Sequence, residues 1–198
     1  MKTTEPTSLD EHLDRLLALE ESADHIHGWH PTLMPGMLQT ADYARAAITT
    51  AAPALPPHDV EKRATGRTVR IDTLGRAAGR TARFVIGESV LTQPVGGPAT
   101  LAAQLDHLMT LLALRPTLEV RVLPRGEGHP GLAGAFTVYR SRPGRSVLVE
   151  NLAGTTVINR PESALSFIHA SDNVGERAAS PVDSLRMIEA ARRRLTHA

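Results

Sequence analysis

Three histidines and the only tryptophan of the chain lie close together and form its densest group of titratable side chains. They are His25, His27, Trp29 and His30. If residues 24–28 are extended, His25 and His27 point to the same side, a spacing that can ligate a metal ion. No third ligand follows at a typical spacing, so we predict no metal and leave metal binding by the three histidines as the least favoured reading. Surface or pocket-rim positions, ligand binding and acid/base chemistry are the alternatives.

Two glutamates lie in segments with the pattern of strands. On a strand, Glu88 shares a face with Ile86 and Val90, and Glu150 shares one with Leu148. A carboxylate on an apolar face must be paired, hydrogen-bonded or protonated, and desolvation raises its pKa. Both are therefore candidate catalytic residues. The alternative is a buried ion pair with an arginine, for which the candidates are Arg83, Arg121 and Arg140.

A third candidate catalytic residue, His129, lies in the Gly-rich segment 126–134, which could cover a pocket. If the protein is an enzyme, we expect Glu88, Glu150 and His129 to carry its acid/base steps.

The segment 34–45 combines a turn with the start of a helix. Pro35-Gly36 is a turn signal, and Thr40 can cap a helix that runs to about residue 51. Free N–H groups at a helix N-terminus favour an anion, so a ligand carboxylate or phosphate could bind there. The alternative is a structural turn held in the core by Met37 and Leu38. The candidate ligand-binding residues are His27, Trp29, His30, Gln39, Thr40 and Tyr43. One apolar pocket could be lined by Trp29, Gln39, Tyr43, Glu88, His129 and Glu150.

Composition restricts the function classes. The 198 residues carry a net charge of +1 and no cysteine, which excludes disulfides and thiolate catalysis and suits a cytoplasmic protein. No apolar run is long enough to span a membrane. Basic stripes occur at Arg63, Arg67 and Arg70 and at residues 192–194, and we expect both to be solvated. We therefore predict no nucleic-acid or membrane partner and no cofactor.

The elements that must position these residues follow from periodicity. Helices are predicted over residues 8–23, where Ser8 and Glu11 fit a capping box, and over 40–51, 58–77 and 98–114. Residues 24–34 are expected as extended chain or loop. Strands are predicted at 83–91, 118–123, 135–141 and 146–152, with 155–159 as a further candidate. Two helices close the chain, the last capped by Ser180.

These elements predict an α+β fold: a mainly antiparallel sheet of about five strands with helices packed on it. We expect one domain over residues 1–198. It comprises an N-terminal helix at 8–23, a core with the sheet at 24–160 and C-terminal helices at 161–198.

The order of several segments resembles the C-terminal domain of actinobacterial regulators of the XRE (xenobiotic-response-element) helix-turn-helix family. The Pro-Gly-Met-Leu-Gln-Thr element at 35–40 is the most specific part. The segments are residues 19–23, 34–45, 84–91, 95–97, 104–108, 120–124, 128–131 and 147–150. The resemblance would place a helix-turn-helix before residue 10, and the residues given there do not have its pattern, so we do not expect DNA binding from this sequence. The Arg-Gln pair of the family reads Arg70-Ile71 here.

The resemblance implies a sensor or interaction module without assigned chemistry. We therefore expect a stand-alone domain that binds a small molecule or a partner protein, with a small partner protein or a homodimer possible and no DNA binding. The alternative is a small-molecule enzyme of specialised metabolism that catalyses a cyclisation, elimination or rearrangement. A third hypothesis is a truncated regulator that forms inactive heterodimers. The sequence identifies neither the ligand nor the oligomeric state.

Overall fold

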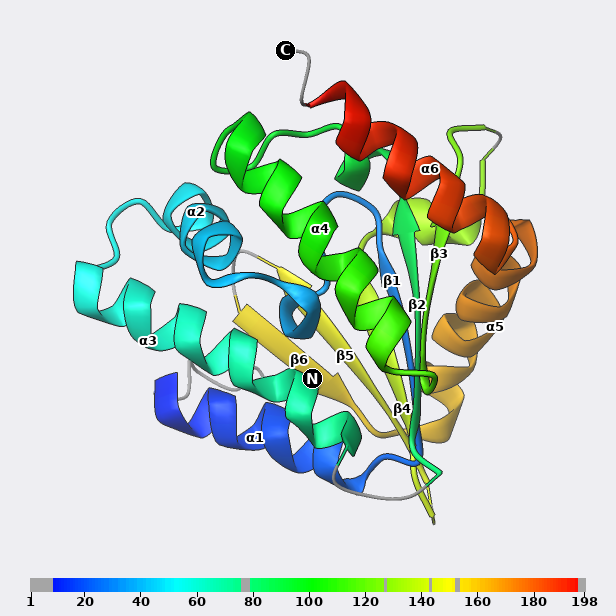
Figure 1. Cartoon of the computed structure of the whole chain (residues 1–198). Helices are drawn as coiled ribbons and strands as arrows, with labels where there is room; N and C mark the ends of the chain where they lie inside the picture. The colour runs from blue at the N-terminus through cyan, green and yellow to red at the C-terminus, as the bar shows by residue number, and fades with distance from the viewer. Residues whose placement is uncertain (1–8, 76–78, 127, 143, 152–153, 196–198) are drawn as a thin grey trace.

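A six-stranded mixed sheet forms the centre of the computed structural model, which describes residues 9–75, 79–126, 128–142, 144–151 and 154–195 (Figure 1). The strands are β1 (His25–His30), β2 (Thr81–Gly87), β3 (Leu118–Leu123), β4 (Phe136–Arg140), β5 (Arg145–Asn151) and β6 (Gly154–Ile158). Their order across the sheet is β3-β2-β1-β4-β5-β6. The pairs β1–β2 and β2–β3 are parallel. The pairs β1–β4, β4–β5 and β5–β6 are antiparallel.

The α+β class is confirmed, but a mainly antiparallel sheet of about five strands is wrong, because the sheet is mixed and has six strands. The sixth strand comes from residues 24–34, which we expected as extended chain or loop and which contain β1. Helices separate β1 from β2 and β2 from β3, and such long crossovers are what parallel pairing requires.

The six α-helices of the described chain are α1 (Leu9–Ser22), α2 (Ala41–Ala51), α3 (Pro57–Thr68), α4 (Pro98–Leu114), α5 (Pro161–Arg177) and α6 (Pro181–Arg194). Thr40 and Ser180 cap α2 and α6 as predicted, since their hydroxyls accept the N–H groups of Tyr43 at 3.3 Å and Asp183 at 3.1 Å. The capping box of Ser8 and Glu11 lies outside the described residues and side chains.

Two predicted elements end early. The helix expected over 58–77 stops at Thr68, and a 3-10 helix, η2 (Val69–Gly75), follows it. The strand expected over 83–91 stops at Gly87 and continues as the 3-10 helix η3 (Glu88–Leu91). Arg70 thereby leaves the α-helical stripe that we expected to be solvated, and the predicted site residue Glu88 leaves the strand.

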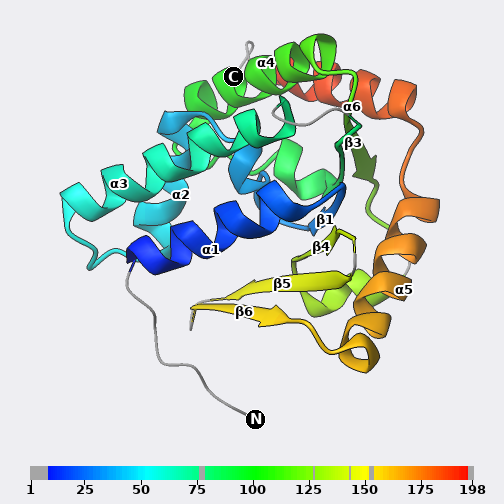
Figure 2. The ribbon, with the colours of Figure 1, turned by 90° about the horizontal axis from the view of Figure 1, so that it is seen from below.

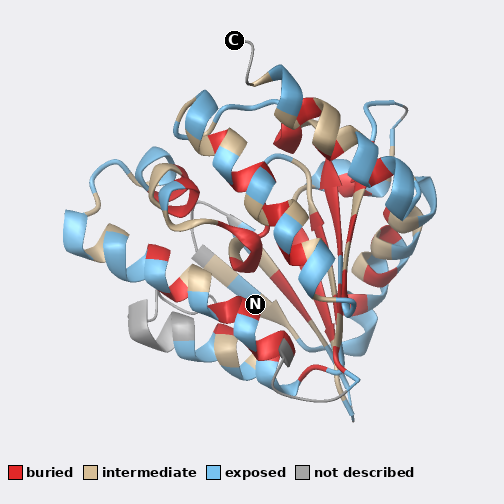
Figure 3. Cartoon of the chain, viewed as in Figure 1, coloured by how far each residue is buried: buried red, intermediate tan, exposed pale blue. Residues whose placement is uncertain are grey.

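The helices cover the two faces of the sheet unequally. Figure 2 shows α5 on one side, whereas α1, α2, α3, α4 and α6 lie on the other. The larger core joins strand residues such as Ile26, Phe84 and Leu148 to the helices on that side, and the smaller core packs Trp29 and Val138 against α5. Buried residues therefore concentrate in the strands and on the inward sides of the helices (Figure 3).

Arg80 ties the first helix to the crossover that precedes β2. Its side chain is buried and donates to three backbone oxygens, those of Ala23 at 2.9 Å, Thr73 at 2.5 Å and Glu21. These contacts hold the end of α1 beside η2.

In the described chain, none of the helices has both the length and the apolar character needed to cross a bilayer.

Candidate functional site

A small cavity lies beneath the turn at residues 35–37, on the face of the sheet that packs against α1, η2 and α4. We call it the turn cavity. Its polar lining comprises Glu20, His30, Arg70, Thr137, Tyr139 and Glu150. Apolar walls come from residues such as Ile26, Phe84 and Leu148. Its volume is ≈ 20 Å³, which is room for about one water molecule.

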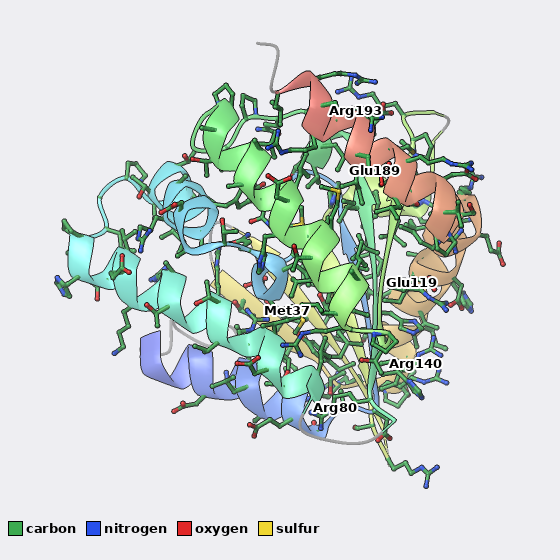
Figure 4. All side chains as sticks on the ribbon, in the orientation of Figure 1. Met37, Arg80, Glu119, Arg140, Glu189 and Arg193 are labelled. Atoms are coloured by element: carbon green, nitrogen blue, oxygen red, sulfur yellow. The ribbon has the colours of Figure 1, made fainter. Side chains whose placement is uncertain are left out.

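The turn over this cavity is a short 3-10 helix, η1 (Gly36–Leu38), in front of the sheet, where Figure 4 labels Met37. The Leu38 N–H donates to the Pro35 oxygen at 2.8 Å, and Met37 and Leu38 are buried. A Cβ added at Gly36 would lie 3.2 Å from Nη1 of Arg70. The glycine therefore lets the turn backbone approach the guanidinium closely.

Three buried or half-buried polar side chains fix the turn against its neighbours. Gln39 donates through Nε2 to the Met34 oxygen at 2.7 Å and accepts from Nη1 of Arg67 at 2.9 Å. Gln104 of α4 accepts the Thr40 N–H at 2.8 Å and donates to the Leu38 oxygen at 2.7 Å. The polar atoms of Gln39 are thus committed to the protein itself.

The N–H groups at the N-terminus of α2 are hydrogen-bonded within the protein. The N–H groups of Thr40 and Tyr43 have acceptors, and Asp42 supplies a negative charge in the first turn. The Tyr43 hydroxyl accepts the Met34 N–H at 3.3 Å, and burial raises the pKa of Tyr43. These residues support the structural reading of the turn, while ligand contact by Gln39, Thr40 and Tyr43 remains a prediction.

A buried ion pair forms one side of the turn cavity. Nε of Arg70 lies 2.9 and 3.1 Å from the two carboxylate oxygens of Glu20, and Nη2 contacts the same carboxylate. Glu20 is 0% exposed and Arg70 9%. Burial raises the pKa of Glu20, and burial alone would lower the pKa of Arg70. The attraction of Glu20 outweighs that burial, so the pKa of Arg70 is raised. The contacts of both Arg70 nitrogens with one carboxylate have the geometry of a charge-assisted pair.

His30 lines the cavity and carries an unsatisfied nitrogen. Its Nε2 is buried and has no hydrogen-bond partner among the described residues. Burial, with a smaller effect from Arg70, lowers the pKa of His30 to about 4, so the ring is neutral at pH 7. Nearby Tyr139 is 3% exposed, and burial raises its pKa. The site therefore offers a neutral imidazole and a protonated phenol next to a fixed ion pair.

The two predicted carboxylates differ from expectation. Glu150 lies on the same face as Leu148 and lines the cavity, but it is exposed, so a buried carboxylate is wrong here. Glu150 is exposed because it is the next-to-last residue of β5, where the helices no longer cover the sheet. Glu88 is half-buried in η3, and its carboxylate accepts the Arg125 N–H at 3.0 Å. Its predicted strand face is therefore wrong.

The other histidines predicted as site residues, His27 and His129, lie on the opposite side of the sheet from the turn cavity. His27 and Trp29 line a second hollow between α5 and strands β1, β2 and β3. We call this hollow the α5 groove, and its lining also includes Arg83, Arg121, Asp172 and Glu176. The rings of His129 and Trp29 meet edge to face, with centroids 5.3 Å apart, and Nδ1 of His129 is buried without a partner among the described residues. Burial, followed by the charges of Arg140 and Arg83, lowers the pKa of His27 to about 4.

His25 and His27 alternate with Ile26 on β1 and so share a face, as the spacing predicted. His25 contacts the Thr81 hydroxyl at 2.8 Å. Within the described ranges, no three His, Cys, Asp or Glu residues group closely enough to hold a metal ion.

The single pocket proposed from the sequence is not assembled. Trp29 and His129 meet on the α5 side, whereas Glu150 lies on the opposite face. Gln39 and Tyr43 are buried in the turn. The expected solvated stripe of arginines is wrong at Arg70, because η2 turns this residue into the interior.

Sequence reasoning missed Glu20, Arg70 and Tyr139 as cavity residues. One available signal was the position of Glu20, three and four residues after Leu17 and Leu16, which places it on the apolar stripe of α1. A glutamate on such a stripe needs a buried cationic partner. Tyr139 carries no comparable signal, since alternation along a strand does not reveal which face receives the helices.

The chain belongs to the DUF5753 family, a domain of unknown function, whose model matches residues 13–190. A comparison with curated proteins found no match. The family match supplies no link to XRE regulators.

Proposed function

We propose that this protein is a small-molecule-binding domain and that the turn cavity receives the polar end of its ligand. The observation that carries the proposal is the unpartnered Nε2 of His30 in the wall of the cavity. A buried polar atom without a partner is costly, and proteins rarely keep one that has no use. A ligand hydroxyl or carbonyl would supply the missing hydrogen bond, because a neutral imidazole nitrogen donates or accepts according to its tautomer.

Charge around the cavity favours a neutral end group. Glu20 and Arg70 neutralise each other, and each already has a partner. His30 is neutral at pH 7 because burial lowers its pKa. An anionic ligand group would have to be desolvated without a free cationic partner among the described lining residues, which is unfavourable, and the carboxylate of Glu150 lies at the exposed edge and not in the buried wall.

The size of the cavity decides how much of the ligand it takes. A volume of ≈ 20 Å³ accommodates one water-sized group, whereas typical ligand sites enclose roughly 300–1,000 Å³. The body of the ligand therefore lies outside, past the exposed Glu150 and over the strands next to it. The terminal group fills the cavity.

The segments that resemble regulator domains converge on this cavity. Glu20, the 35–37 turn, Phe84 and Glu150 come from separate parts of that resemblance, and each contributes to the lining. This convergence supports a sensing role for the site.

The test is a thermal-shift screen of small alcohols, amides and ketones against the wild type and His30→Phe. Wild type should be stabilised by about 2.7 kcal/mol when a true ligand exceeds its dissociation constant 100-fold. His30→Phe should lose this response. His58→Phe is the matched control, because the side chain of His58 is 81% exposed. A ligand that stabilises His30→Phe as much as wild type would disprove the assignment of the site.

The enzyme alternative is favoured by one observation, the presence of a neutral imidazole beside a buried phenol in the same cavity. Such a nitrogen could accept a proton from a bound substrate. Ligands that pass the screen should then be incubated with wild type, His30→Phe and Glu150→Gln and analysed by mass spectrometry and chiral chromatography. Unchanged ligands with wild type would eliminate the alternative.

A further inference from the structure

The α5 groove is a second hollow, on the side of the sheet opposite the turn cavity. Its volume is ≈ 350 Å³, which falls in the range of roughly 300–1,000 Å³ that ligand sites have. Strands β1, β2 and β3 form one wall, and α5 forms the other. The residues that matter for recognition are Trp29, Arg83, Arg121, Asp172, Gly175 and Glu176.

The strand wall is cationic. Arg83 is half exposed and pairs with Glu119, whose Oε1 lies 2.8 Å from its Nε. Arg121 is half-buried and donates to the carbonyl oxygens of Ala179 at 2.8 Å and Ala178 at 2.5 Å. Carbonyl oxygens satisfy N–H groups without neutralising the charge, and Arg121 has no carboxylate partner among the described residues. An anionic ligand group would supply the missing counter-charge.

The helix wall is acidic. Asp172 lies 3.7 Å from Nη2 of Arg140, which Figure 4 labels on the α5 side of the sheet. Glu176, one turn further along α5, is exposed and has no ion-pair partner among the described residues. The groove thus carries opposite charges on its two walls.

The floor and shape of the groove suit an apolar body. Val85, Val174 and Trp29 line the hollow between the charged walls. Gly175 faces the hollow, and a Cβ added there would meet no atom within 4 Å. A glycine inside a helix is destabilising relative to alanine. Since packing does not require this glycine, the open space beside α5 is what it preserves.

We propose that the α5 groove binds a short zwitterionic ligand with an apolar middle, of the size and charge of a dipeptide. Its carboxylate meets Arg121 and Arg83, its ammonium group meets Glu176 and Asp172, and its side chains lie on Val85 and Trp29. Opposite walls of opposite charge select a ligand whose two charges are at its two ends. This site is separate from the turn cavity and does not depend on the function proposed there.

The test uses the dipeptide Leu-Leu as probe, followed by calorimetry and by the fluorescence of Trp29, the only tryptophan. N-acetyl-Leu-Leu and Leu-Leu amide each lack one charge. We expect Leu-Leu to bind at least about tenfold more tightly than either blocked form, a factor that equals about 1.4 kcal/mol. In Glu176→Gln, the preference for the free amine over the acetylated form should fall, because only Asp172 then faces the ammonium group, while the preference for the carboxylate remains unchanged.

Gly175→Leu fills the groove and should abolish binding while the circular dichroism spectrum stays unchanged. Glu162→Gln, exposed at the start of α5, is the matched control and should bind like wild type. The proposal is overturned if Leu-Leu shows no saturation up to ~10 mM, if both blocked forms bind equally well, or if Gly175→Leu binds normally. His30→Phe separates the two sites. Loss of dipeptide binding in that variant would place the dipeptide in the turn cavity and overturn the groove proposal.

Discussion

Trp29 and His30 are neighbours on β1, but they face opposite sides of the sheet and line different hollows. Trp29 belongs to the α5 groove, and its Nε1 donates to the Gly131 oxygen at 2.7 Å. His30 belongs to the turn cavity, with its ring centroid 5.9 Å from that of Phe84. The alternation of side chains along a strand therefore separates a cluster that looked like one site in the sequence.

Removing one partner of the buried Glu20–Arg70 ion pair should strongly destabilise the fold. Glu20→Gln leaves Arg70 charged in the interior, and we expect the free energy of unfolding to fall by about 3–5 kcal/mol. Urea denaturation measures this. Glu20→Leu combined with Arg70→Met should recover most of the loss, because no charge then stays buried alone.

Glu61→Gln is the control for that measurement, since Glu61 forms its ion pair with Arg45 at the surface, at 2.6 Å. It should leave the denaturation midpoint unchanged. A Glu20→Gln protein as stable as this control would show that the interior pair does not hold α1 to η2.

Stability should depend on the protonation of His30. Burial lowers its folded pKa to about 4 from 6.5, so the unfolded chain binds the proton more readily between these values. The contribution of the neutral His30 ring to the free energy of unfolding is fully present above pH 6.5 and is lost as the pH falls toward 4. A difference of this size corresponds to about 3 kcal/mol. Glu20 acts in the opposite direction, because burial raises its pKa.

Urea denaturation of wild type and His30→Phe at a series of pH values between about 7 and about 4 checks this dependence. The variant should lose less stability over that window and should not be less stable than wild type at pH 7. Parallel pH profiles of the two proteins would contradict the assigned pKa shift.

The conformation of the turn at residues 35–40 should depend on Gln104 of α4, whose side chain is 0% exposed and bonds to the turn backbone. Gln104→Leu leaves the Thr40 N–H and the Leu38 oxygen without partners, and we expect a loss of about 2–4 kcal/mol. Thermal unfolding measures it. Gln93→Leu, at an exposed position, is the control and should have little effect.

Two glycines should respond oppositely to alanine. At Gly131 a Cβ would lie 2.6 Å from Nε1 of Trp29 and 2.9 Å from Cγ2 of Val174, so Gly131→Ala should destabilise the protein by about 1–3 kcal/mol. Gly175→Ala meets open space and should stabilise α5 by up to about 1 kcal/mol. Chemical denaturation with Trp29 fluorescence follows both. Similar losses in the two variants would contradict the open space at Gly175.

Local patterns in the sequence predicted local structure well. Leucine periodicity placed the helix at 98–114, and alternation placed the strand at 118–123, both in agreement with α4 and β3. Thr40 and Ser180 act as caps because their signals depend only on the next few residues. Parallel pairing was not predicted from the strand residues alone, since it depends on the crossovers that connect the strands.

The candidate site was predicted only in part. His30 and Glu150 do line the turn cavity, but the pairing of Glu20 with Arg70 joins residues 50 positions apart. No short window contains that information. Tyr139 reaches the cavity through its register opposite Ile26, which depends on which strand β4 pairs with.

The contacts of Arg80 have a consequence for how the turn cavity forms. By holding the Glu21 and Thr73 oxygens, this side chain fixes the backbone next to Glu20 and three residues after Arg70. Both partners of the ion pair are therefore in place before any ligand arrives. The entropy of ordering them is lost during folding, so the binding that we propose for this cavity would need less induced rearrangement.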